Sequence, residues 1–193
     1  MRGLLIAFEG LDQSGKQTQA ERLRDRLTAA GRSVTLLSFP DYQTHIGQEI
    51  GHALRGERAY SADVMQLLYV ANRYEYAEQI AQARDAGTII ICDRYLASSI
   101  AYGDAQGLDP VWLLEIQRYL PQPDLTILLD IPPAVSARRK VDDRDKYERD
   151  LALLGRVRES YFRQAADGWL RLDADRDRGE VSEDVFRAVS SRL

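Results

Sequence analysis

The sequence predicts an α/β domain with a five-stranded parallel β-sheet that is covered by helices on both faces. Two features of the 193 residues carry this prediction. Short apolar runs, typical of strands buried on both faces, alternate with longer stretches of helical periodicity. Glycine or proline stands at several of the junctions, where the chain has to turn. There is no repeat, low-complexity tract or linker, so we expect residues 1–193 to form a single domain.

The N-terminal elements are expected to be a strand, a helix and a second strand. Residues 4–8 are all apolar and predict a buried strand. After a glycine-bearing turn, apolar positions from Ala20 to Leu27 recur at helical spacing, and Gly31 stands where this helix should end. Residues 34–39 predict the second strand.

The middle of the chain is expected to add two helices and the third strand. A short helix is predicted over residues 46–54 and a long one over residues 62–86. Gly87 suits the end of the long helix. The apolar run at 88–92 then predicts a third buried strand.

Proline marks the restart of helices in the C-terminal half. Pro110 suits the first turn of a helix that would run to about residue 120, and the pair at 132–133 begins another. Between them, residues 125–129 predict the fourth strand. The remaining expected elements are a helix that continues beyond the charged segment 140–150 to about residue 166, a weaker strand over 169–172, and a last helix capped at its N-terminus by Ser182.

Composition limits the class of partner. The formal net charge is −4, which argues against broad nucleic-acid binding, because that requires a positive surface. The first apolar stretch stops at Glu9, and no apolar run approaches the ~20 residues of a membrane span. We therefore expect no nucleic-acid partner, no signal peptide and no membrane partner. The one cysteine, Cys92, suits a reducing compartment, so we expect a cytoplasmic protein.

The most specific motif is the turn after the first strand, which is typical of a phosphate-binding loop. Its glycines let successive N–H groups point inward, where they form a nest for phosphate oxygens with the N-terminus of the following helix. Lys16 would add a positive charge at the β- and γ-phosphates of a nucleotide. The residues expected around the phosphates are Gly10, Leu11, Asp12, Gln13, Ser14, Gly15, Lys16, Gln17 and Thr18.

Position 17 leaves the metal ligand open. The lysine of this motif is usually followed by Ser or Thr, whose hydroxyl binds Mg²⁺, but here Gln17 follows, with Thr18 next. Gln17 either offers its amide oxygen to the metal, directly or through water, or leaves that place to water alone. The alternatives to a working loop are a glycine-rich turn without a ligand and a nucleotide binder without catalytic activity.

A second polar group follows the third strand. Ligands of open parallel sheets bind beyond the carboxyl ends of the strands, so Asp93 and Arg94 should emerge beside the phosphate loop. The carboxylate of Asp93 would hold the hydration shell of Mg²⁺, and Arg94 would bind an acceptor phosphate. The alternative is an ordinary ion pair at the surface.

Tyr69 and Arg73 stand four residues apart in the expected long helix and therefore share one face. A ring that stacks on a base and a guanidinium that holds its phosphate would suit a nucleoside monophosphate. Spacing alone favours the simpler interpretation, a core aromatic and a solvated arginine.

The segment at about 139–150 is dense in charge of both signs and includes Arg139 and Arg144. It is either an ion-paired helix surface or a mobile lid that supplies cations and excludes water during phosphoryl transfer. Position 13 of the phosphate loop is Gln13 and carries no basic side chain. We therefore expect Arg144 to supply an additional positive charge for catalysis.

Together these motifs resemble the thymidylate kinase family, in its order and at its approximate spacing over nearly the whole chain. The resemblance implies the P-loop kinase fold with a short lid, ATP and Mg²⁺ as cofactors, and a homodimer. The matching stretches are residues 8–16, Phe39-Pro40, residues 68–73, Asp93-Arg94-Tyr95 through Ala101-Tyr102, and Leu129-Asp130.

The resemblance also implies roles for single residues. Tyr69 would stack on thymine, Arg73 would hold the base in register, and Arg94 would bind the acceptor phosphate. Asp12 looks like the acidic loop residue beside the acceptor sugar and phosphate, and Arg139 like the arginine that packs on adenine. Ser98, Ser99 and Tyr102 would line the nucleoside pocket.

The expected reaction is therefore ATP + dTMP to ADP + dTDP. The catalytic residues would be Lys16, Arg94, Arg144 and Asp12, and Asp93 would serve the metal. Two alternatives stay open: a kinase for another nucleoside monophosphate or a deoxynucleoside, and a nucleotide-binding regulatory module without catalysis.

Overall fold

The computed structural model describes residues 2–139, 150–165 and 168–193. Their strands form one sheet in the order β2-β3-β1-β4-β5, and all of the neighbouring pairs are parallel. This confirms the expected five-stranded parallel sheet. The strands are β1 (Leu5–Glu9), β2 (Val34–Ser38), β3 (Ile89–Asp93), β4 (Leu125–Asp130) and β5 (Leu170–Asp173).

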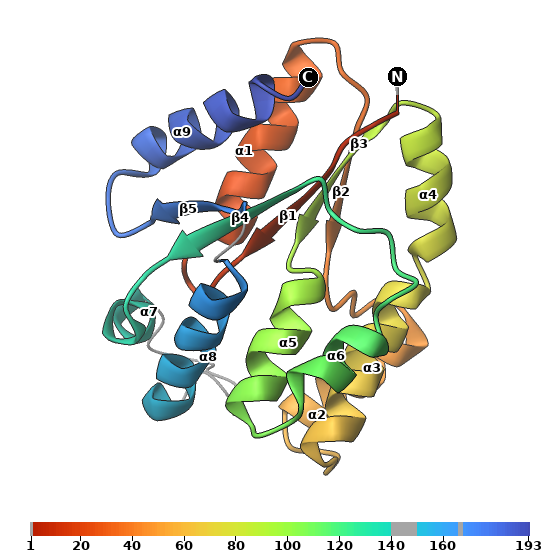
Figure 1. The fold of residues 1–193 in the computed structure, drawn as a ribbon, viewed down its shortest axis with the longest axis vertical. Coiled ribbons are helices and arrows are strands. Elements are labelled where there is room, and N and C mark those ends of the chain that lie inside the picture. The colour runs from red at the N-terminus through yellow and green to blue at the C-terminus, as the bar shows by residue number, and fades with distance from the viewer. Residues whose placement is uncertain (1, 140–149, 166–167) are drawn as a thin grey trace.

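Helices cover both faces of the sheet (Figure 1). Helices α1 and α9 lie on one side, and α4, α5 and α8 lie on the other. Because every strand runs in the same direction, the loops after β1 and β3 emerge together at one edge. The helices are α1 (Lys16–Ala29), α2 (His45–Leu54), α3 (Ala62–Tyr74), α4 (Ala77–Asp85), α5 (Leu96–Ala105), α6 (Pro110–Glu115), α7 (Pro133–Arg139), α8 (Leu151–Gln164) and α9 (Arg178–Ser190).

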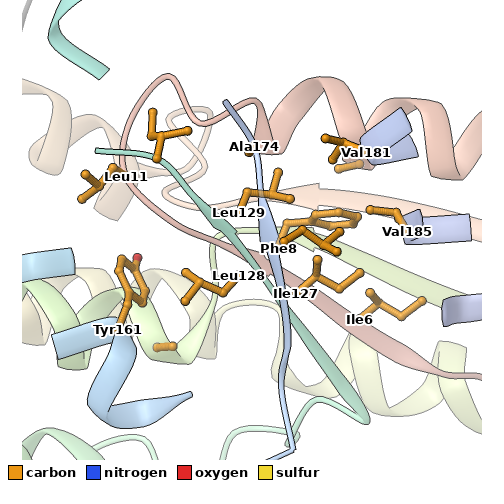
Figure 2. Close-up of a cluster of buried hydrophobic side chains, with 14 of the residues drawn as sticks. Ile6, Phe8, Leu11, Ile127, Leu128, Leu129, Tyr161, Ala174, Val181 and Val185 are labelled. Carbon is orange, nitrogen blue, oxygen red and sulfur yellow. The ribbon is translucent and has the colours of Figure 1, made fainter. Parts of the chain in front are cut away.

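The core holds the central strands rigidly below this edge. Side chains of β1 alternate between the faces: Ile6 and Phe8 pack toward α1 and α9, whereas Leu5 and Ala7 pack toward α4. Figure 2 shows Ile6 and Phe8 beside Ile127, with Val185 of α9 close to them. The loop that follows β1 therefore starts from a fully buried strand.

Three expectations about helices are wrong. The stretch 62–86 is two helices, α3 and α4, because the ring of Tyr76 packs edge-on against Phe39 and its hydroxyl donates to Asp41. Those tertiary contacts turn the chain between the two helices. The last helix begins at Arg178 rather than near Ser182, since the carboxylate of Asp177 accepts the N–H groups of residues 179 and 180.

The third wrong expectation concerns α6, which ends at Glu115 rather than near residue 120. In addition, helix α5 was not expected at all. Most of α5 is buried on every side, so its sequence lacks the polar face that reveals an amphipathic helix.

The expected lid falls almost entirely on residues 140–149, which lie outside the described residues. Arg144 is among them. Within the described part of the chain, the helices are all too short or too polar to cross a membrane.

Candidate active site

The loop between β1 and α1 has the backbone of a phosphate nest. Gly10 and Gly15 have φ angles of 139° and 92°, and Gln13 also has a positive φ of 61°. A Cβ on Gly10 would lie 2.4 Å from the carbonyl oxygen of Leu129, so no other residue fits there. The absence of a side chain at Gly10 therefore lets the loop lie close against β4.

Lys16 is the first residue of α1, and its side chain folds back over the loop. Its Nζ donates a 2.7 Å hydrogen bond to the carbonyl of Leu11. Burial lowers the pKa of Lys16, and the positive charge of Arg94 lowers it further, to about 8. The carboxylates of Asp12, Asp93 and Glu9 oppose this effect but do not cancel it. The ammonium group is thus short of negative charge, a deficit that phosphate oxygens would fill.

Arg94 connects the loop with the end of β3. Its Nη2 donates to Asp12 Oδ1 at 2.6 Å and its Nη1 to the carbonyl of Gly10 at 3.2 Å. Its φ of 62° is unusual for a residue with a side chain, and such strain is common at functional sites. The sequence prediction that Arg94 lies beside the phosphate loop is confirmed.

Asp12 is held in the charged form by its neighbours. Tyr102 donates to Asp12 Oδ2 at 2.9 Å, while Arg94 holds the other oxygen. Burial would raise the pKa of Asp12, but the charges of Arg94 and Lys16 outweigh it and lower the pKa below its ordinary value. An anionic Asp12 therefore lies between the two cations.

Glu9, whose role was not predicted from the sequence, orients Arg94 indirectly through Ser98 and Tyr161. Its fully buried carboxylate accepts hydrogen bonds from the backbone N–H of Tyr95 (2.9 Å), from Ser98 Oγ (2.6 Å) and from Tyr161 (3.2 Å). Ser98 Oγ and the Tyr161 hydroxyl in turn lie 3.1 and 3.4 Å from Arg94 Nη1. The signal in the sequence was an acidic residue closing an otherwise apolar strand.

A small pocket of about 90 Å³ opens beside Arg94, between α3 and α5. Arg73, which is buried, donates to Ser99 Oγ at 2.7 Å across this pocket. The interpretation of Arg73 as solvated is therefore wrong, because α5 covers it. The structure brings together here the predicted residues Tyr69, Arg73, Ser98, Ser99 and Tyr102, and adds Phe39, Pro40, Tyr42, Leu54 and Gln66.

A larger cleft of about 490 Å³ lies over the phosphate loop, and its lining is strongly cationic. Arg139 reaches over it, donating to the carbonyls of Gln13 and Ala174 at 3.1 Å each. The cleft has two acidic lining residues, Asp12 and Asp93. Its cationic lining residues are Lys16, Arg94, Arg139, Arg176 and Arg178. The sequence analysis missed Arg176 and Arg178, because charged residues outside a motif give no signal of their own.

Asp93 fits a role at a hydrated metal ion. Its Oδ1 is buried at the end of β3 and has no hydrogen-bond partner within residues 2–139, 150–165 and 168–193. Among the residues with described positions, no three His, Cys, Asp or Glu gather as a metal cluster. One carboxylate beside substrate phosphates is the usual protein contribution to a Mg²⁺ site. Gln17 also lines the cleft, and its Nε2 donates to Glu21 at 2.9 Å.

Comparison with known proteins identifies the family. A family model described as thymidylate kinase matches residues 8–185. The chain belongs to the thymidylate kinase family. A thymidylate kinase of Schizosaccharomyces pombe is 35% identical over 98% of this chain and 93% of its own length. A probable thymidylate kinase of Pyrococcus abyssi is 38% identical over 100% of this chain and 98% of its own.

A solved structure gives the same family. The thymidylate kinase of Candida albicans is 30% identical, with a TM-score of 0.84 over 99% of this chain and 92% of that one. The thymidylate kinase family catalyses ATP-dependent phosphorylation of dTMP to dTDP, so the chain is an enzyme of this class. Membership confirms the resemblance and the P-loop kinase fold, and it decides against a regulatory module without catalysis.

Proposed function

We propose that the two cavities are the donor and acceptor sites of this thymidylate kinase. ATP would occupy the cationic cleft over the phosphate loop, and dTMP the small pocket between α3 and α5. The observation that carries the proposal is that both cavities share Asp12 and Arg94, so the two sites meet at those side chains. A γ-phosphoryl group at that junction would face the acceptor phosphate.

The reaction would proceed by direct in-line attack of the acceptor phosphate on the γ-phosphorus of ATP. The acceptor is already ionised near neutral pH, so no strong base is needed. Lys16, the loop N–H groups and Arg94 would stabilise the charge that spreads over the transferring group. Arg144 is proposed as a further cation from the lid, and Asp12 as the group that keeps Arg94 and Lys16 oriented.

The nucleoside contacts follow from the pocket. Tyr69 would stack on thymine, and Arg73 with Ser99 would hold the edge of the base. Tyr102 would lie against the deoxyribose. Ser98 would act mainly through Arg94, because its hydroxyl is already bonded to Glu9.

Mg²⁺ is proposed as the metal cofactor, held by Asp93 through water and by the substrate phosphates. When bound, it would neutralise charge on the β- and γ-phosphates. Arg139 would pack on the adenine, beside Ala174. The residues proposed around the phosphates remain Gly10 to Thr18 of the loop and the start of α1.

We further propose that the single domain works as a cytoplasmic homodimer. Leu67 and Tyr74 on α3 and Val111 and Leu114 on α6 are large apolar side chains left exposed. The Tyr74 hydroxyl donates to the carbonyl of Ile116 at 3.2 Å, so these helix surfaces are neighbours. An apolar face shared by two helices suits contact with a second copy.

A coupled ADP-release assay tests the proposed function. We expect ADP release with ATP and dTMP, slower release with dUMP, and loss of activity when Mg²⁺ is chelated. Release without any acceptor is the control for simple ATP hydrolysis. Equal rates with and without dTMP, or full activity in the presence of chelator, would contradict the proposal.

The affinity for ATP should fall as the pH rises above about 8. Since Lys16 in the free protein has a lowered pKa of about 8, it loses its charge above that pH. Binding of ATP then requires Lys16 to take up a proton from the solvent. We expect the Kd for ATP to rise by up to about tenfold per pH unit above that point. Calorimetry between pH 7 and 9.5 measures it.

Lys16→Arg is the matched control for this pH dependence. A guanidinium stays charged throughout the range, so the variant should show a flat profile whatever its absolute affinity. A wild-type Kd that is the same at pH 7.5 and 9.5 would contradict the prediction that Lys16 loses, within this range, a charge that ATP binding needs.

A further inference from the structure

The pocket proposed for the thymine base contains a polar side chain that has no assigned role. Gln66 of α3 is fully buried and lines this pocket. Among the residues that the structure describes, neither Nε2 nor Oε1 of its amide has a hydrogen-bond partner. Buried polar atoms are nearly always hydrogen-bonded, because an unpaired one costs about 1–3 kcal/mol. A group from outside the protein is therefore needed to satisfy this amide.

The helix places Gln66 on the face that carries the other pocket residues. Gln66, Tyr69 and Arg73 occupy positions i, i+3 and i+7 of α3, which lie along one stripe of a helix. Tyr69, the proposed stacking ring, stands between the other two. Arg73 also has a buried donor, its Nε, for which the described part of the chain offers no acceptor, although its Nη1 is bonded to Ser99. Unpaired hydrogen-bonding groups therefore lie on either side of the proposed stacking position.

An imide is the chemical group that complements these atoms. A pyrimidine such as thymine has a ring N–H flanked by two carbonyl oxygens along one edge. A primary amide offers an acceptor beside a donor, so it can accept from the N–H and donate to one of the carbonyls. We propose that Gln66 recognises this imide edge, with Oε1 accepting from N3–H and Nε2 donating to the adjacent carbonyl.

This assignment rests on the proposed function, because it names a contact within the dTMP pocket. An ordered water is the competing explanation of the unpaired amide. A water would satisfy Gln66 in the free protein but would not make the enzyme sensitive to the imide proton of the substrate. The two explanations therefore differ in substrate selectivity.

The first test replaces the amide by an apolar chain of similar length. We expect Gln66→Met to raise KM for dTMP by roughly 10- to 100-fold, with kcat and KM for ATP nearly unchanged. Gln117→Met is the matched control, since Gln117 is also buried, its Oε1 also has no partner among the described residues, and it lies outside both proposed sites. An unchanged KM for dTMP in Gln66→Met would overturn the proposal.

The second test compares two substrates on one enzyme, so partial misfolding cannot affect it. The substrates are dTMP and its N3-methyl analogue, which lacks the imide proton. We expect wild type to prefer dTMP in kcat/KM by about 100-fold or more, and Gln66→Ala to narrow this preference by about tenfold or more. Thermal unfolding of each variant reports the fold separately.

The outcomes also separate this inference from the proposed function. A wild type that phosphorylates dTMP while Gln66→Ala keeps the full preference would overturn the role of Gln66 and leave the function intact. A wild type that phosphorylates no pyrimidine monophosphate would overturn both. A narrowed preference in Gln66→Ala, with the Gln117→Met control unchanged, supports the role.

Discussion

Replacing Arg94 with alanine is expected to lower kcat/KM for dTMP by about 100-fold or more. Arg94 is the partly buried cation shared by the two cavities, so it would contact phosphate in both the ground state and the transition state. Burial works against its charge, yet Asp12 raises the pKa of Arg94 above its ordinary value. Without Arg94, Asp12 would be a partly buried anion with Lys16 as its remaining cationic neighbour. The negative charge of Asp12 would then repel the acceptor phosphate.

Steady-state kinetics with dTMP varied at saturating ATP measure this effect. Arg94→Lys keeps the charge but cannot make the fork of hydrogen bonds to Asp12 and Gly10, so we expect only partial recovery. Arg187→Ala, at an exposed position of α9, is the control for general charge removal. An Arg94→Ala enzyme that turns over dTMP like wild type would show that the acceptor phosphate binds elsewhere.

Lys16→Ala is expected to lower kcat by about 100-fold or more. The ammonium group lies at the phosphate loop and would follow the charge as it moves onto the leaving β-phosphate, so most of its effect should appear in the transition state. In the free protein it is bonded to the carbonyl of Leu11 and would have to leave that bond to reach ATP. Single-turnover measurements with saturating ATP isolate the chemical step.

Stability separates a catalytic effect of Lys16 from misfolding. The lowered pKa means that the folded protein holds the charged ammonium less well than the unfolded chain does. Its removal should therefore leave the free energy of unfolding unchanged or raise it, while kcat falls. Parallel losses of kcat and of the melting temperature would instead point to a structural role.

The strands of this protein could be predicted because their apolar runs are continuous. The runs at 4–8 and 125–129 became central strands, with boundaries shifted by one residue. The helices were harder, since local spacing does not contain the contacts that end them. Tyr76 turns the chain through its contacts with Phe39 and Asp41, which are more than thirty positions away.

The site shows the same division. Residues tied to a motif, such as Lys16 and Arg94, could be found because backbone geometry and charge are needed at fixed positions. Glu9 and Gln66 could not, because their importance comes from tertiary packing. Helices α5 and α8 cover Glu9, and Gln66 lies in the pocket between α3 and α5. Burial turns an ordinary carboxylate into the support of an arginine, and an ordinary amide into an unpaired hydrogen-bonding group.

The hydrogen bonds of Glu9 also make the support of Arg94 depend on α8, a late segment of the chain. Translation delivers the chain from its N-terminus at about 5–20 residues per second, so Glu9 and Ser98 leave the ribosome seconds before Tyr161. Until α8 arrives, the carboxylate lacks the phenol that closes its hydrogen-bonding shell, and Arg94 lacks one of its supports. A nascent chain that has not yet reached α8 would thus hold Glu9 and Arg94 with fewer hydrogen bonds than the folded protein does.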